Sequence, residues 1–167
     1  VLATSSLAPA FAADMNKTLR VAVSAAETGF DPQAISDLYS GFVTRVIFDP
    51  LYQYDYLARP FKIIPNTAVA LPEISDDGKK WIIKVKPGIY FTDDPAFKGK
   101  KRELTAYDYI YSWKRLIDPK VRAPNIEAVT DRFIGEQAFL AAMKSTANVY
   151  DIEFQGMKAL DRYTIEL

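Results

Sequence analysis

Cysteine and histidine are both absent from the 167-residue sequence. Without cysteine there is no disulfide and no thiolate nucleophile, and without either residue there is no zinc site built on them. The lack of an imidazole also removes the usual general base and the triad histidine. An acylated lipoprotein needs a cysteine at its mature N-terminus, so we expect no lipid anchor.

The formal net charge of the sequence is zero. Lys and Arg together number 21, as do Asp and Glu, so no long-range field draws the chain to nucleic acid or to an anionic membrane. The basic run 98–102 is short and is followed by Glu103, which is typical of a solvated loop. No run approaches the ~18 apolar residues that a membrane-spanning helix needs. We therefore expect no nucleic-acid partner and no membrane-spanning segment.

Residues 1–13 are small, apolar and uncharged, and they contain the small-x-small pattern Ala10-Phe11-Ala12 after which signal peptidase cleaves. We interpret residues 1–12 as the remnant of a signal peptide and residues 13–167 as the start of the mature protein. An alanine-rich disordered tail is the alternative. The first interpretation predicts an exported protein.

The first half of the chain alternates short strand and helix signals. Apolar residues alternate with others over 19–23, which predicts a half-buried strand, and they fall at helical spacing over 39–47, which predicts a core helix. A short strand is expected at 51–55. The run Ser-Asp-Asp-Gly at 75–78 predicts a turn. Behind it, the alternation over 81–86 predicts a strand with one solvent-exposed face.

The second half contains the clearest helix signal. After a long loop over 92–104, Thr105 and Asp108 have capping-box spacing and precede an apolar helical stripe over 109–117. A further helix is expected over 132–144, and a hairpin over 157–167. Together these elements predict an α/β fold.

Signals for catalysis are weak. The pairs Asp76-Asp77 and Asp93-Asp94 could bind a cation, but Asp-Asp-Gly is more typical of a plain turn. Ser112 and Lys114 lack the surrounding motif of a Ser–Lys nucleophile pair, and no glycine-rich phosphate loop is present. We therefore predict no catalytic residue, no metal site and no cofactor.

Aromatic residues are abundant, with ten Tyr, ten Phe and two Trp. Four of them are expected in the core, namely Phe48, Trp81, Phe91 and Trp113. Three tyrosines could instead line a ligand cleft through their ring edges and hydroxyls, namely Tyr39, Tyr52 and Tyr54.

Several segments, read in chain order, are similar to one known family. They are FDPLY at 48–52, LPEISDDG at 71–78, WIIKVKPGIYF at 81–91, LTAYDYIYSWKRLIDP at 104–119 and MKALD at 157–161. The resemblance is to family 5 extracellular solute-binding proteins, the oligopeptide- and dipeptide-binding receptors of ABC importers. The block at 104–119 is the most specific of the five.

This resemblance implies part of the N-terminal lobe of a two-lobed periplasmic binding protein of the class II type, truncated so that the second lobe is absent. The function it implies is capture of a peptide, or a similar amide-bearing solute, by a periplasmic, monomeric receptor that delivers it to the permease subunits of an ABC importer. Two alternatives stay open: the same fold used as a ligand sensor or cargo chaperone, and a secreted hydrolase.

The resemblance also suggests ligand contacts. In the oligopeptide receptors the loop before the first helix touches the peptide backbone, and Asp31-Pro32 aligns this loop so that Ser36, Asp37 and Leu38 occupy it. Ser36 or Asp37 could instead simply cap the helix. Asn125 stands where those receptors have a tyrosine, and its amide could bond a peptide group. The 92–104 loop is longer than in most members and is expected to be a surface elaboration.

Overall fold

The structure is a computed structural model that describes residues 14, 16–144 and 149–167. The expected signal-peptide remnant at 1–12 lies outside these residues. The helices are α1 (Leu38–Ile47), α2 (Ala106–Ile117) and α3 (Glu136–Met143), with 3₁₀ turns η1 (Pro95–Phe97), η2 (Ile126–Ala128) and η3 (Val149–Asp151). The strands are β1 (Tyr52–Tyr54), β2 (Ile63–Pro65), β3 (Glu73–Ile74), β4 (Trp81–Lys84), β5 (Lys158–Ala159) and β6 (Thr164–Glu166).

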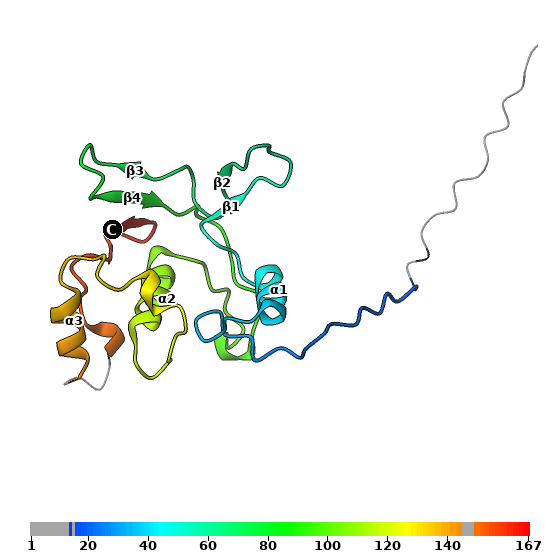
Figure 1. Cartoon of the computed structure of the whole chain (residues 1–167). Coiled ribbons are helices and arrows are strands. Elements are labelled where there is room, and N and C mark those ends of the chain that lie inside the picture. The colour runs from blue at the N-terminus through cyan, green and yellow to red at the C-terminus, as the bar shows by residue number, and fades with distance from the viewer. Residues whose placement is uncertain (1–13, 15, 145–148) are drawn as a thin grey trace, which may run out of the picture.

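The larger sheet is antiparallel, with strand order β3-β4-β6-β5. The turn at 75–78 joins β3 to β4, and the expected hairpin near the end of the chain supplies β5 and β6. Ile83 of β4 lies opposite Ile165 of β6, so segments some eighty positions apart form its centre. A separate hairpin consists of β1 and β2. Figure 1 shows α2 and α3 on the same side of the larger sheet.

The core lies between that sheet and α2. Ile83 and Ile165 of the sheet, and Ile110 and Ile117 of α2, are all buried, which is the face that the period-2 and helical patterns predicted. The Phe139 ring of α3 closes the core by stacking on Phe154, with centroids 4.7 Å apart. Burial of this apolar surface is the main term that stabilises the arrangement.

α2 begins as predicted. The Asp108 carboxylate accepts hydrogen bonds from Thr105 N at 2.7 Å and from Thr105 Oγ1 at 2.9 Å, and Asp108 also forms an ion pair with Arg102. The reciprocal contact fixes the first turn of the helix. The helix ends at Ile117, before Asp118-Pro119.

The strand predicted over 19–23 is wrong. Leu19 and Val21 are 85% and 74% exposed, and Figure 1 shows the segment as extended chain that runs away from the fold. A strand needs a neighbour to satisfy its N–H and C=O groups. No described residue pairs with this segment.

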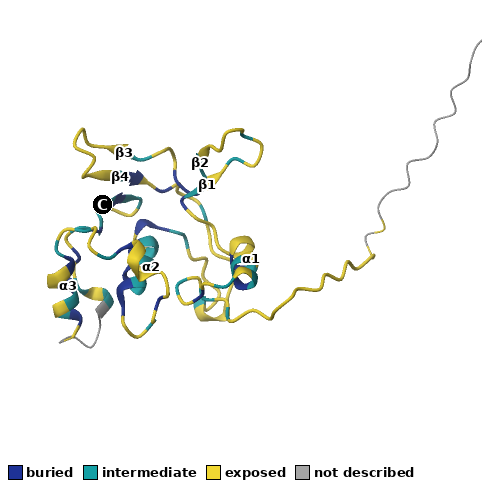
Figure 2. Cartoon of the chain, in the orientation of Figure 1, coloured by how far each residue is buried: buried dark blue, intermediate teal, exposed yellow. Residues whose placement is uncertain are grey.

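The helix over 39–47 is confirmed, but its predicted core role is wrong. Ser40 and Thr44 are its buried residues, whereas Phe42 and Val46 are 52% and 85% exposed. Figure 2 shows the large exposed part of α1. The Ser40 hydroxyl on the polar face accepts hydrogen bonds from the preceding loop, whereas Phe42, Val46 and Ile47 of the apolar stripe are exposed.

Two smaller expectations also differ from the structure. α3 starts at Glu136 rather than near residue 132, because Gly135 has φ 80°, a left-handed value that lies outside a helix. Three of the four predicted core aromatics are wrong, since Phe48, Trp81 and Phe91 are 38–49% exposed. Trp113 does pack against the core. No helix in the described part of the chain is both long and apolar enough to span a bilayer.

Candidate ligand-binding site

The loop over 28–37 is held against the first turns of α1 by Ser40. The Ser40 hydroxyl is fully buried and accepts hydrogen bonds from Thr28 N at 2.9 Å and Gly29 N at 3.3 Å. Buried hydroxyls of this kind stabilise a loop because their loss leaves backbone N–H groups unpaired. The start of the loop is therefore fixed relative to the helix.

Asp37 is the N-cap of α1. Its Oδ1 accepts from Ser40 N at 2.8 Å, and its Oδ2 accepts from Thr28 Oγ1 at 2.5 Å. These hydrogen bonds, from Ser40 first and then Thr28, hold the pKa of Asp37 well below its usual range, so the carboxylate is charged at neutral pH. A carboxylate has about four lone-pair sites, so further donors can still bind. The capping role that the sequence left open for Asp37 is thus present.

Ser36 and Leu38 flank Asp37 and face solvent. Ser36 is exposed, and none of the described residues hydrogen-bonds its hydroxyl. Leu38 is 60% exposed although it begins a helix with an apolar stripe. A polar group that can donate and accept therefore stands beside an apolar side chain on the same open segment.

Asn125 contacts the segment before α1, although it lies ninety positions after Ile35 in the chain. Its Nδ2 donates to the Ile35 carbonyl at 3.5 Å, and it stands just before η2. Its side-chain oxygen has no partner among the described residues. The structure thus brings all four sequence-predicted residues into one neighbourhood. Ser40, which sequence reasoning missed, was detectable as a serine within a stripe of apolar residues.

The three tyrosines that were expected to line a ligand cleft lie in different surroundings. Tyr39 lies beside the loop, where its hydroxyl accepts from Ser24 N at 3.2 Å. The Tyr52 hydroxyl is buried without a hydrogen-bond partner in the described part of the chain, and burial raises its pKa. Tyr54 is on the β1–β2 hairpin, where it makes an edge contact with Phe61. Tyr39 is therefore the one of the three next to the candidate site.

The acidic pairs have turn roles. Asp77 Oδ1 accepts from Ser75 Oγ at 2.6 Å within the β3–β4 turn. Asp94 Oδ1 accepts from Ala96 N at 2.8 Å and caps η1. Within residues 14, 16–144 and 149–167, no group of three Cys, His, Asp or Glu side chains is placed to hold a metal ion.

A pocket of about 560 Å³ lies elsewhere, between the 118–120 turn and α3. Its charged lining residues are Asp118, Lys120 and Lys144, and the C-terminal ends of α2 and α3 meet there. The partial negative charge of two helix ends opposes that of the lysines. The charges therefore select no class of ligand, and none of the four predicted site residues lines this pocket.

The mixed α and β arrangement of this chain is similar to that of part of a solved periplasmic binding protein. A solved structure with the same arrangement is the DppA binding protein of Helicobacter pylori in complex with the peptide STSA, at TM-score 0.54 and 27% identity over 82% of this chain and 24% of that one. The predicted fold, part of a lobe of a two-lobed binding protein, is confirmed.

Residues 62–167 match the family described as "Bacterial extracellular solute-binding proteins, family 5 Middle", and the chain belongs to that family. It is 32% identical to di/tripeptide-binding protein 2 of Pseudomonas aeruginosa over 62% of this chain and 19% of the relative. It is 27% identical to the probable deoxycholate-binding periplasmic protein YgiS of Escherichia coli over 82% of this chain and 23% of that relative. The chain thus spans about a fifth of the length of these relatives, both of which are named as binding proteins.

Proposed function

We propose that this chain supplies one wall of the ligand cleft of a periplasmic receptor that captures peptides, or similar amide-bearing solutes, for an ABC importer. On this proposal the receptor is exported to the periplasm by a signal peptide. The protein acts by binding rather than by catalysis. It works as a monomer that docks on the permease subunits in the inner membrane once it has closed on its ligand.

The observation that supports this proposal is that Ser36, Asp37 and Leu38 lie on one open segment of a family 5 chain and that Asn125 bonds the adjacent Ile35 carbonyl. The first N–H groups of α1 and the Ser36 hydroxyl offer donors to peptide carbonyls. The Asn125 amide and Asp37 offer acceptors to peptide N–H groups. Leu38 adds an apolar contact. This mixture suits a peptide backbone, in which donors and acceptors alternate.

A second ligand class has specific support, because one relative is named as a probable deoxycholate-binding protein. An apolar sterol acid would use Leu38 and the exposed stripe of α1 more than the polar groups. The roles of ligand sensor or cargo chaperone would employ the same site, so the presence or absence of neighbouring permease and ATPase genes separates them from transport. A hydrolase would instead turn over a chromogenic substrate, and Asp93→Asn or Asp94→Asn would abolish that turnover.

The proposal is tested on the protein produced from its full reading frame. Mass spectrometry of the ligand that co-purifies is expected to reveal short peptides. Asn125→Ala and Ser36→Ala are each expected to weaken peptide binding about tenfold, because each removes one buried hydrogen bond in the complex.

The matched control is Ser75→Ala, which removes a serine hydroxyl from the β3–β4 turn and is expected to leave affinity unchanged. A co-purified sterol acid, or peptide affinities that neither site variant alters, would contradict the assignment.

A further inference from the structure

The five residues before the ligand-facing segment are attached to the rest of the fold at every second position. Asp31 bonds Arg115, Gln33 bonds Ser112, and the Ile35 carbonyl accepts from Asn125. We name residues 31–35 the tethered segment. Its partners lie 79 to 90 positions further along the chain. Residues 31–34 form a turn in which Ala34 N donates to the Asp31 carbonyl at 3.0 Å, so the three attachments start from one compact segment.

The first attachment is the most directional. Arg115 Nη1 donates to Asp31 Oδ1 at 3.0 Å, and Nη2 donates to Oδ2 in a second, parallel bond. The hydrogen bond from Arg115 lowers the pKa of Asp31, and the hydrogen bond to the Asp31 carboxylate raises the pKa of Arg115. A bidentate pair fixes the angle between the two groups as well as their distance. Both side chains are partly buried, at 26% and 40% exposure, so solvent screens the pair less than a fully exposed one.

The second attachment uses the same face of α2. Gln33 Nε2 donates to Ser112 Oγ at 2.8 Å, and positions 112 and 115 are neighbours on a helix surface because they are three residues apart. The opposite face of α2 is fixed by buried Ile110 and Ile117. The tethered segment is therefore attached to an element that is itself held in the core.

We propose that Arg115, assisted by Ser112, is a positioning residue that presets the ligand-facing residues 36–38 without touching the ligand. This inference rests on the proposed function of those residues. A segment that is already ordered loses little conformational entropy when the ligand binds. The free energy of its contacts with the ligand is therefore not offset by an ordering cost, and the affinity is higher. Loosening the tether lowers affinity although every ligand contact is retained.

Amide hydrogen exchange of this chain tests the tether itself. Arg115→Gln is expected to speed exchange at the Ala34 amide, which donates to the Asp31 carbonyl, and at the Gly29 amide by at least tenfold. Exchange at the core amides of Ile110 and Ile165 is expected to stay unchanged. Arg115→Lys keeps the charge without the planar fork and should give an intermediate effect. Glu73→Gln, which breaks the exposed Lys84–Glu73 ion pair, is the matched control and should not change loop exchange.

Unchanged loop exchange in Arg115→Gln overturns the inference, as does an increase shared equally by loop and core amides. Calorimetry with tri-alanine on the product of the full reading frame completes the test, with an expected tenfold loss of affinity in Arg115→Gln. If the wild type binds and the variant binds equally well, this inference alone fails. If the wild type binds neither tri-alanine nor a mixture of short peptides, the proposed function fails, whatever the exchange data show.

Discussion

At the scale of single residues, Glu103 joins three separate segments. Its Oε1 accepts hydrogen bonds from Gly88 N at 2.7 Å and from the Tyr163 hydroxyl at 2.9 Å, and its Oε2 accepts from Arg162 Nη2 at 2.7 Å. These bonds, that of Arg162 first, lower the pKa of Glu103 to about 2. The carboxylate ties the loop before α2 to the turn between β5 and β6.

This shift predicts a pH-dependent stability difference between the wild type and Glu103→Gln. A carboxyl whose pKa falls on folding contributes stability that is fully present above its unfolded pKa, about 4.5, and is lost as pH falls toward about 2. The wild type should therefore be the more stable protein at pH 7, and the two should converge near pH 2. Urea unfolding midpoints at a series of pH values measure the difference. A difference that stays constant with pH would contradict this account.

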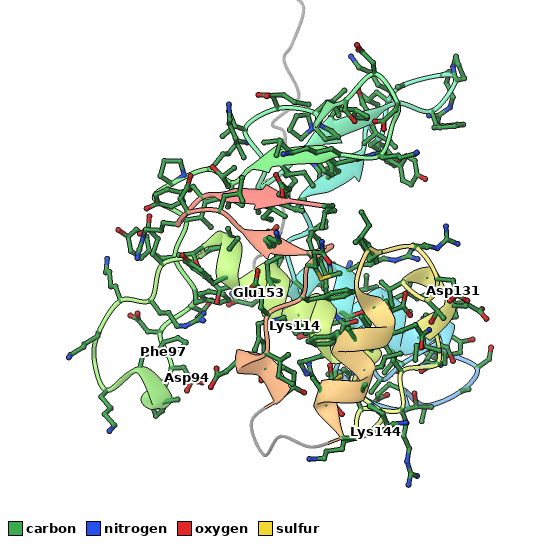
Figure 3. All side chains as sticks on the ribbon, turned by 90° about the vertical axis from the view of Figure 1, so that its left-hand side faces the viewer. Asp94, Phe97, Lys114, Asp131, Lys144 and Glu153 are labelled. Atoms are coloured by element: carbon green, nitrogen blue, oxygen red, sulfur yellow. The ribbon has the colours of Figure 1, made fainter. Side chains whose placement is uncertain are left out.

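Lys114 shows how a buried charge is accommodated. Its ammonium donates to the carbonyls of Tyr150 at 3.1 Å and Ile152 at 2.6 Å, and burial lowers its pKa. Figure 3 shows Lys114 close to the segment that carries Glu153. The amphipathic pattern of α2 could not reveal this role, because the partners lie 36 and 38 positions further along the chain.

At the scale of elements, substitution of two glycines by alanine is expected to change stability in opposite directions. A Cβ at Gly41, inside α1, would meet no atom within 4 Å, whereas a Cβ at Gly156 would lie 2.7 Å from Ile134 N and 2.9 Å from the Phe133 Cβ. Gly41→Ala should stabilise the chain by up to about 1 kcal/mol through helix propensity. Gly156→Ala should destabilise it by about 1–3 kcal/mol through overpacking. Thermal or urea unfolding of the two variants tests both signs, and equal effects would show that local packing does not decide them.

Elements whose signals are local were predictable from the sequence. α2 has its cap, its stripe and its stop within fifteen residues, and the turn at 75–78 carries its own Asp-Asp-Gly chemistry. The segment 19–23 and the apolar face of α1 were not, because their state depends on what packs against them. A pattern reports which side of an element is apolar but not whether another part of the protein covers it.

At the scale of the whole molecule, the candidate site follows the same division. The sequence resemblance selected Ser36, Asp37, Leu38 and Asn125, and the structure brings them together. The tether through Arg115 was beyond prediction, because no local pattern pairs Asp31 with a residue 84 positions further along the chain. On the proposed account, the exposed stripe of α1 and the open site are surfaces that further polypeptide covers in a longer receptor.

The central claim is that this chain is one wall of a cleft and that a ligand needs the opposite wall as well. Isothermal titration calorimetry of the 167-residue chain with a mixture of short peptides tests it most directly. The account predicts no measurable heat of binding at micromolar concentrations, because on this account the opposite wall supplies the other ligand contacts. Micromolar binding by the chain alone would contradict it.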